Sequence, residues 1–107
     1  MERIRKILVI DDEPDVVSYL SAFLEDEGFQ VLAASNGPEG LAMAREEAPD
    51  LITLDITMPG MSGIEVLTTL RRDEGLSGLP VVIITGVSSF DKLTDYRDVR
   101  APEGFMQ

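Results

Sequence analysis

The chain has 107 residues, which suffices for one domain with its own hydrophobic core. It contains no cysteine and no histidine, which excludes disulfides, thiolate metal sites, histidine bases and a phosphohistidine of its own. Its 20 acidic and 9 basic side chains leave a net charge of −11, which disfavours direct binding to nucleic acid or an anionic membrane. Because neither a signal peptide nor an apolar run of membrane-spanning length is found, we expect a soluble cytoplasmic protein.

The first third of the sequence predicts a strand, a helix and a second strand. Residues 6–11 contain an uninterrupted apolar run, which is typical of a strand covered on both faces. Pro14 suits the first position of a helix, with Asp12 as the expected cap and Gly28 as the expected stop. Residues 29–34 are then predicted to form the second strand.

The next elements follow the same alternation. The turn sequence at residues 35–38 starts a second helix, which Pro49 ends, and Leu51–Asp55 is predicted to be the third strand. Ser62 and Glu65 have the spacing of a capping box and open a third helix. The remaining predicted elements are a strand at residues 81–85, a helix from Ser88 or Ser89 to Val99, and a fifth strand that begins at residues 104–107.

This order of elements predicts a doubly wound α/β sheet with strand order 2-1-3-4-5. In that order the first and third strands are neighbours, and ligands bind where their carboxyl ends meet. Asp11, Asp12 and Asp55 follow those two strands and would repel one another unless a cation lay between them. Oxygen ligands favour Mg²⁺, so the sequence predicts a magnesium site at this edge.

The sequence also carries three motifs at the ends of successive predicted strands. Together they resemble the receiver domains of two-component response regulators, and the resemblance covers essentially the whole chain. It implies a flavodoxin-like (βα)5 fold and a single receiver domain at residues 1–107. The motifs are Val9-Ile10-Asp11-Asp12-Glu13, the segment from Asp55-Ile56-Thr57-Met58-Pro59-Gly60 to Met61-Ser62-Gly63, and Ile84-Thr85-Gly86.

The resemblance implies that Asp55 is the phosphoacceptor. It would take a phosphoryl group from a phosphohistidine of a histidine kinase or a histidine phosphotransfer protein. Asp12 would be a direct Mg²⁺ ligand, Asp11 a ligand through water, and Asp55 and the main-chain carbonyl of Thr57 further oxygen ligands. This agrees with chemistry, because a carboxylate becomes a usable nucleophile when a metal holds the phosphoryl group in line.

The resemblance also implies a switch in the segment from the fourth strand to the end of the chain. Thr57 and Gly86 would bind the phosphoryl group, Gly86 through its backbone N–H, and the hydroxyl of Thr85 would bond it only after transfer. Phe105 falls where the family carries an aromatic switch residue. Phosphorylation would then change the affinity for a downstream effector domain or protein.

Each of these residues also has a purely structural interpretation. Asp11 and Asp12 can cap a helix, and Asp55 can be an ordinary turn residue. Thr85 suits the end of a strand without any function, and Phe105 suits a core position. The pairing of acidic residues across two strands favours the site.

The chain departs from the family pattern at its end. Receivers carry a lysine followed by proline after the fifth strand, and here Gln107 is the last residue. Lys92 does not replace that lysine, because it lies early in the predicted fourth helix. We therefore expect a receiver that is incomplete at its C-terminus and lacks the fifth helix. Such a chain would expose apolar surface and be marginal, oligomeric or strand-swapped, and homodimers through the fourth helix and fifth strand are a family habit.

Two other functions compete with the receiver, which is not a conventional enzyme. A Mg²⁺-dependent phosphohydrolase with an aspartate nucleophile needs a second aspartate two positions on, where this chain has Thr57. A pseudo-receiver would bind partners without ever taking phosphate. The four residues Asp11, Asp12, Asp55 and Thr85 argue against it, and the missing lysine argues for it.

Overall fold

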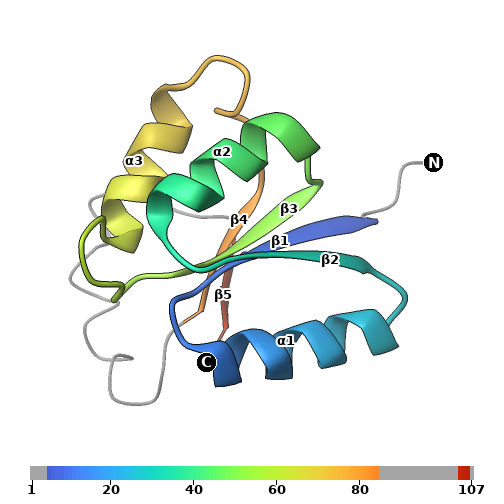
Figure 1. Cartoon of the computed structure of the whole chain (residues 1–107). Coiled ribbons are helices and arrows are strands. Elements are labelled where there is room, and N and C mark those ends of the chain that lie inside the picture. The colour runs from blue at the N-terminus through green and yellow to red at the C-terminus, as the bar shows by residue number, and fades with distance from the viewer. Residues whose placement is uncertain (1–4, 85–103, 107) are drawn as a thin grey trace.

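A single parallel sheet organises the protein. The computed structural model describes residues 5–84 and the backbone of residues 104–106. The sheet order is β2-β1-β3-β4-β5, which confirms the predicted topology (Figure 1). The strands are β1 (Lys6–Ile10), β2 (Gln30–Ala34), β3 (Leu51–Asp55), β4 (Val81–Ile84) and β5 (Gly104–Met106).

Three helices flank the described part of the sheet. They are α1 (Pro14–Asp26), α2 (Gly37–Glu47) and α3 (Gly63–Arg72). Helix α1 covers one face, and α2 and α3 lie side by side on the other (Figure 1). The helix predicted from Ser88 or Ser89 to Val99 lies outside the described residues.

The start of α1 corrects one prediction. The N-cap is Glu13, which makes no side-chain cap hydrogen bond, so the prediction that Asp12 caps this helix is wrong. The carboxylate that bonds this turn belongs instead to Asp11, whose Oδ1 accepts the N–H of Glu13 at 2.9 Å. Since Pro14 at the first helical position has no N–H, the first turn of α1 has one unpaired backbone donor fewer than usual.

The end of α1 has the geometry that its glycine predicts. Gly28 has a φ of +97°, in the left-handed region that favours glycine. The N–H of Gly28 donates to the carbonyl of Glu25, and that of Phe29 to the carbonyl of Leu24. These two bonds form a Schellman motif, which ends the helix and turns the chain into β2.

Side-chain caps begin the other two helices. The side chain of Asn36 accepts the N–H of Glu39 at 2.8 Å at the start of α2. Ser62 and Glu65 form the predicted capping box, with distances of 2.8 Å and 3.2 Å. The box fixes where α3 begins after the loop that leaves β3.

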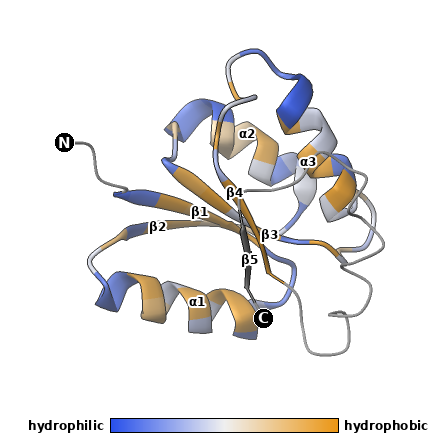
Figure 2. Cartoon of the chain, turned by 180° about the vertical axis from the view of Figure 1, so that it is seen from behind, coloured by the Kyte–Doolittle hydropathy of each residue, from blue (hydrophilic) through white to orange (hydrophobic). Residues whose placement is uncertain are grey.

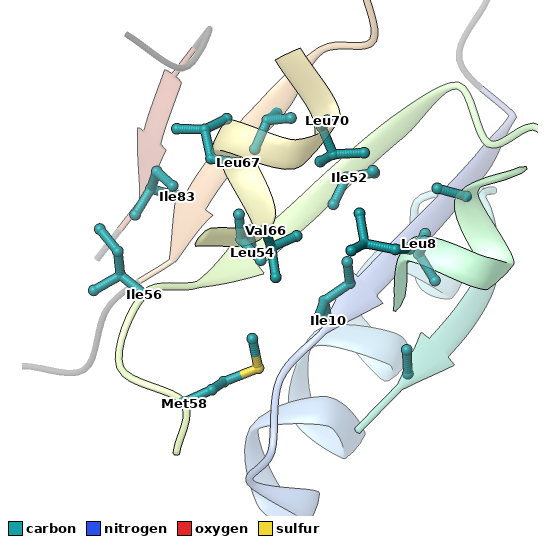
Figure 3. Packing of buried hydrophobic residues seen from close by; sticks show 14 residues of the cluster. Leu8, Ile10, Ile52, Leu54, Ile56, Met58, Val66, Leu67, Leu70 and Ile83 are labelled. Carbon is teal, nitrogen blue, oxygen red and sulfur yellow. The ribbon is translucent and has the colours of Figure 1, made fainter. Parts of the chain in front are cut away.

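The main core lies between the sheet and the pair α2 and α3. Figure 3 shows it as a continuous layer of aliphatic side chains, and the strands it rests on are strongly hydrophobic in Figure 2. The chain beyond β3 contributes to this layer through Ile56 and buried Met58. The cluster consists of Leu8, Ile10, Ala34, Leu41, Ala44, Ile52, Leu54, Ile56, Met58, Val66, Leu67, Leu70, Val81 and Ile83.

None of the helices within residues 5–84 combines the length and the apolar character that crossing a membrane requires.

Candidate functional site

The register of the sheet brings two aspartates to the same level. Ile10 of β1 pairs with Leu54 of β3, so Asp11 and Asp55, which follow them, end neighbouring strands side by side. Asp11 extends the pairing of β1, since its N–H donates to the carbonyl of Ala34 at 3.1 Å. Both aspartates are buried, with exposed fractions of 4% and 7%.

Asp12 joins this pair from the first residue of the loop. One carboxylate oxygen from each of Asp11, Asp12 and Asp55 lies within 4.8 Å of the others, and Asp12 is the more exposed of the three. The predicted convergence of the three carboxylates is therefore confirmed. Their oxygens form a compact acidic group at the carboxyl edge of the sheet, where doubly wound folds bind ligands.

Both buried aspartates are anchored by the residue two positions on. The Oδ1 of Asp11 accepts the N–H of Glu13 at 2.9 Å. The Oδ1 of Asp55 accepts two hydrogen bonds from Thr57, at 3.0 Å from its N–H and at 3.1 Å from its hydroxyl. These bonds fix the direction in which each carboxylate leaves the sheet.

Burial and mutual repulsion disfavour charge in this group. Burial raises the pKa of Asp11 from 3.8 to about 6, and the nearby charges of Asp55 and Asp12 add to the effect. Burial also raises the pKa of Asp55, and Asp12 contributes, while the two hydrogen bonds from Thr57 act in the opposite direction. A divalent cation would offset the charge that raises both values.

The donor set fits Mg²⁺. It consists of oxygens alone, drawn from three carboxylates that are close enough to share one ion. Hard cations such as Mg²⁺ are bound in this way, by a few carboxylates together with water. The excess of carboxylate charge in a confined space is the physical reason for the fit.

A cavity of about 350 Å³ adjoins the acidic group between the start of α1 and the end of β2. Its lining includes the acidic residues Asp11, Asp12 and Glu39. It opens to solvent beside Asp11 and Asp12, whereas Asp55 does not line it. The other lining residues are Pro14, Val17, Ser18, Ala33, Ala34 and Ser35.

The remaining predicted site residues have different outcomes. The main chain of Thr57 lies beside Asp55, but the role of its carbonyl as a metal ligand stays a prediction. Thr85 and Gly86 lie outside the described residues. The backbone of Phe105 is in β5, paired with Ile83, and its side chain is outside the described part, so its switch role also stays a prediction.

Two contacts of the site were missed from the sequence. The hydroxyl of Thr57 bonds the carboxylate of Asp55, and Gly63 packs so closely that a Cβ there would overlap the carbonyl oxygen of Asp55 and the Cα of Ile56. The second contact had a signal, since a glycine at the start of a helix calls for an explanation. The first had none, because a threonine after a strand is unremarkable by itself.

The fold and the site together define a class. A doubly wound parallel sheet with three clustered aspartates at its switch point defines an α/β domain whose acidic edge offers a donor set suited to a cation and to phosphoryl chemistry. More specifically, the chain belongs to the response regulator receiver domain family, whose model matches residues 7–104.

Curated relatives and solved structures agree with this assignment. Protein PilH of Pseudomonas aeruginosa is 45% identical over 80 residues, which are 75% of this chain and 66% of PilH. The chemotaxis protein CheY4 of Vibrio cholerae superposes with a TM-score of 0.83 and 30% identity, covering 97% of this chain and 86% of that one. Response regulator TrrA of Thermotoga maritima, solved in complex with Mg²⁺ and BeF, has a TM-score of 0.79 and 31% identity, covering 96% and 85%.

The chain is shorter than the curated proteins that it resembles. It spans about two thirds of PilH, and between 34% and 37% of two longer relatives that are named as a DNA-binding response regulator and a transcriptional regulatory protein. The match lies in the receiver part, so the similarity is to that domain of the longer proteins.

Proposed function

We propose that Asp55 accepts a phosphoryl group from a phosphohistidine on a partner protein and that this changes the affinity of the domain for a downstream target. The observation that carries the proposal is the position of Asp55. Its buried carboxylate lies within 4.8 Å of those of Asp11 and Asp12, at the edge of the sheet where ligands bind. Membership of the receiver family supports the same reaction.

Phosphoryl transfer follows from this arrangement. An oxygen of Asp55 attacks phosphorus, the new P–O bond forms as the P–N bond of the phosphohistidine breaks, and the imidazole nitrogen leaves with the electron pair. Because the acceptor ends as an aspartyl phosphate on the protein itself, the reaction is a signalling step without turnover.

The oxygen ligands at this edge would hold the cation that this step needs. Asp11, Asp12, Asp55 and the main-chain carbonyl of Thr57 would hold Mg²⁺, with Asp11 acting through water. When bound, Mg²⁺ supplies positive charge that offsets the carboxylates and the charge of the transferred group. Similarity to TrrA, which was solved with Mg²⁺ and BeF, supports this ion.

The switch and the partners extend the proposal beyond the described residues. Thr85 and Gly86 would bond the phosphoryl group after transfer, and Phe105 would respond to the movement. The phosphodonor would be a histidine kinase or a histidine phosphotransfer protein, and the target an effector domain or protein. The longer relatives, in which the matching receiver is only part of the chain, support such an output.

Labelling the full chain tests the proposal. The protein is incubated with Mg²⁺ and acetyl phosphate, and the adduct is mapped by mass spectrometry. We expect a single adduct on Asp55 that Asp55→Asn abolishes and that chelation of Mg²⁺ prevents. Asp26→Asn, which removes an exposed acid at the end of α1, is the matched control and should label like the wild type.

Other outcomes would point elsewhere. Release of free phosphate over many turnovers would indicate an aspartate-nucleophile phosphohydrolase. Absence of any adduct, in a protein that includes a lysine after the fifth strand, would indicate a pseudo-receiver that binds partners without being phosphorylated. An adduct that persists in Asp55→Asn would refute the assignment of the acceptor.

A further inference from the structure

The loop that follows β3, residues 56–62, is held by hydrogen bonds at its two ends. The N–H of Thr57 donates to Oδ1 of Asp55 at 3.0 Å, and the N–H of Gly63 donates to the carbonyl of Ile56 at 3.3 Å. The backbone of residues 58–61, by contrast, makes no backbone–backbone hydrogen bond with another residue of the described part of the chain. The middle of the loop is therefore placed by the packing of its side chains.

Two methionines supply this packing. Met58 is 5% exposed and enters the main core, as Figure 3 shows. Gly60 has a φ of +74°, a left-handed conformation that turns the chain between the two methionines. Met61 is partly buried and packs against the same core. The loop is thus fixed to the body of the protein at two points.

Met61 packs against Gly37, the first residue of α2. A Cβ added at Gly37 would lie 2.9 Å from Sδ of Met61, 3.0 Å from its Cβ, and 2.9 Å from Cγ2 of Val66 on α3. These distances are well below the roughly 3.5–4.0 Å of ordinary van der Waals contacts. The φ of Gly37 lies outside the left-handed region, so a glycine is needed here for space and not for conformation.

Helix α2 is itself packed closely on β1. A Cβ added at Gly40, about one helical turn after Gly37, would lie 2.5 Å from Cδ1 of Ile10 and 2.9 Å from its Cγ1. Ile10 is the last residue of β1 and directly precedes Asp11. The first turn of α2 therefore contacts both the strand that leads to Asp11 and the loop that follows Asp55.

We propose that Met61 is a positioning residue, which holds the loop after β3 against α2 so that the loop is already ordered when a cation binds. This rests on the proposed function, in which the main-chain carbonyl of Thr57 on this loop is an oxygen ligand of Mg²⁺. A loop that must be ordered on binding costs affinity, because its backbone freedom is lost at that step. The thioether of Met61 is a soft ligand that does not suit Mg²⁺, so its effect is indirect.

A purely structural role of Met61 predicts a different pattern. If the side chain only filled core space, its truncation would lower the free energy of unfolding and leave the affinity for Mg²⁺ unaltered. Leu70 provides the matched control, because it is 0% exposed and belongs to the same core, but lies near the far end of α3. Leu70→Ala should therefore lower stability without weakening the binding of Mg²⁺.

The first test measures the Kd for Mg²⁺ of the full chain by isothermal titration calorimetry, with urea unfolding of each variant alongside. For Met61→Ala we expect a Kd about 5-fold higher, the order of effect expected from losing the order of about one backbone residue. Met61→Leu keeps the apolar bulk and should stay within about 2-fold of the wild type. Leu70→Ala should also stay within about 2-fold.

A second pair of variants tests whether α2 provides the contact. Gly37→Ala places a methyl group in the space that Met61 occupies, and its Kd should also rise about 5-fold. Gly78→Ala is the matched control, since a Cβ there would meet nothing within 4 Å. In the double variant Gly37→Ala with Met61→Ala, the loss should not exceed the larger of the two single losses, because both substitutions remove the same contact.

Each alternative outcome counts against the proposal. An unchanged Kd in Met61→Ala would overturn the positioning role, as would an equal rise in Leu70→Ala. Losses that multiply in the double variant would show that Gly37 and Met61 act separately, which would overturn the role of α2. Wild-type protein that binds no Mg²⁺ would overturn the proposed function as well, whereas wild type that binds Mg²⁺ together with an unaffected Met61→Ala overturns this inference alone.

Discussion

The two faces of the sheet are built differently. The face toward α2 and α3 carries a continuous cluster of aliphatic side chains, while the smaller cluster toward α1 has four buried members, Ile7, Val9, Leu20 and Ile84. The residues packed around the smaller cluster remain partly exposed, and on the outer side of α1 Tyr19 and Phe23 are exposed by 71% and 48%. One face is therefore deeply buried, and the other is thinly covered by the described residues.

Strand alternation assigns the acidic residues to the thinly covered face. Leu54 points into the larger cluster, so its neighbours along β3, Thr53 and Asp55, point to the α1 side. Asp55 accordingly pairs with Ile84, which belongs to the smaller cluster. Within the described residues, the larger hydrocarbon cluster and the acidic group therefore lie on opposite faces of the same sheet.

The largest loss of stability is expected from truncating a side chain in the core between the sheet and helices α2 and α3. Leu67 on α3 is 1% exposed, and Leu67→Ala should lower the free energy of unfolding by about 3–4 kcal/mol, because it leaves a cavity that the dense core cannot close. Leu24→Ala on α1, where the leucine is partly buried, is the matched control and should cost about 1–2 kcal/mol. Urea denaturation measures both, and equal losses would contradict the contrast between the faces.

The acidic edge should make stability depend on pH. Since the pKa of Asp11 is raised from 3.8 to about 6 in the folded state, the folded protein binds more protons than the unfolded one in this window. Without metal, the contribution of Asp11 should be complete below about pH 4 and lost as the pH rises through about 6. We expect a loss of about 1–2 kcal/mol, discounted for the solvent that reaches the edge.

Comparison with a variant isolates this dependence. Thermal or urea unfolding from pH 4 to 7 in the presence of a chelator is measured for the wild type and for Asp11→Asn, which cannot titrate at this position. The difference between the two curves should fall across the window. If the free energy of unfolding of the wild type minus that of Asp11→Asn rises with pH, Asp11 is stabilised as the anion. That result would contradict the prediction.

The charge of Asp55 should be destabilising in the absence of metal. Burial raises the pKa of Asp55, so at neutral pH Asp55→Asn relieves repulsion from Asp12 and should raise the free energy of unfolding by about 1 kcal/mol. Addition of Mg²⁺ should reverse the order, since the wild type gains binding energy that the variant largely lacks. Unfolding curves with and without Mg²⁺ check this, and a destabilised variant under both conditions would contradict it.

The smallest change in stability is expected from a substitution on the outer side of α1. Tyr19 is 71% exposed, so Tyr19→Ser should change the free energy of unfolding by less than about 0.5 kcal/mol. Unfolding is measured at two protein concentrations. A loss of stability as large as that of Leu24→Ala, or one that grows with protein concentration, would mean that the outer side of α1 is covered in solution. The two faces of the sheet would then differ less in burial than the described residues indicate.

Local signals in the sequence predicted most of the elements correctly. Ser62 and Glu65 predicted their capping box, and Gly28 predicted the left-handed end of α1, because both depend on residues a few positions apart. The role of Asp12 as a helix cap was predicted wrongly. Asp11 and Asp12 are adjacent and chemically identical, and only the packing of the turn determines which of them bonds the N–H of Glu13.

The sequence alone determined the strands, the helices that follow them and the acidic residues at their ends, because apolar runs and caps act over short stretches of chain. The tertiary structure decided what those residues do together. The register of β1 against β3 brings Asp11 level with Asp55, and the path of the loop after β3 places the hydroxyl of Thr57 within hydrogen-bond distance of a single carboxylate oxygen of Asp55. Such details depend on contacts between distant segments and on sub-ångström packing, which residue types and spacing do not encode locally.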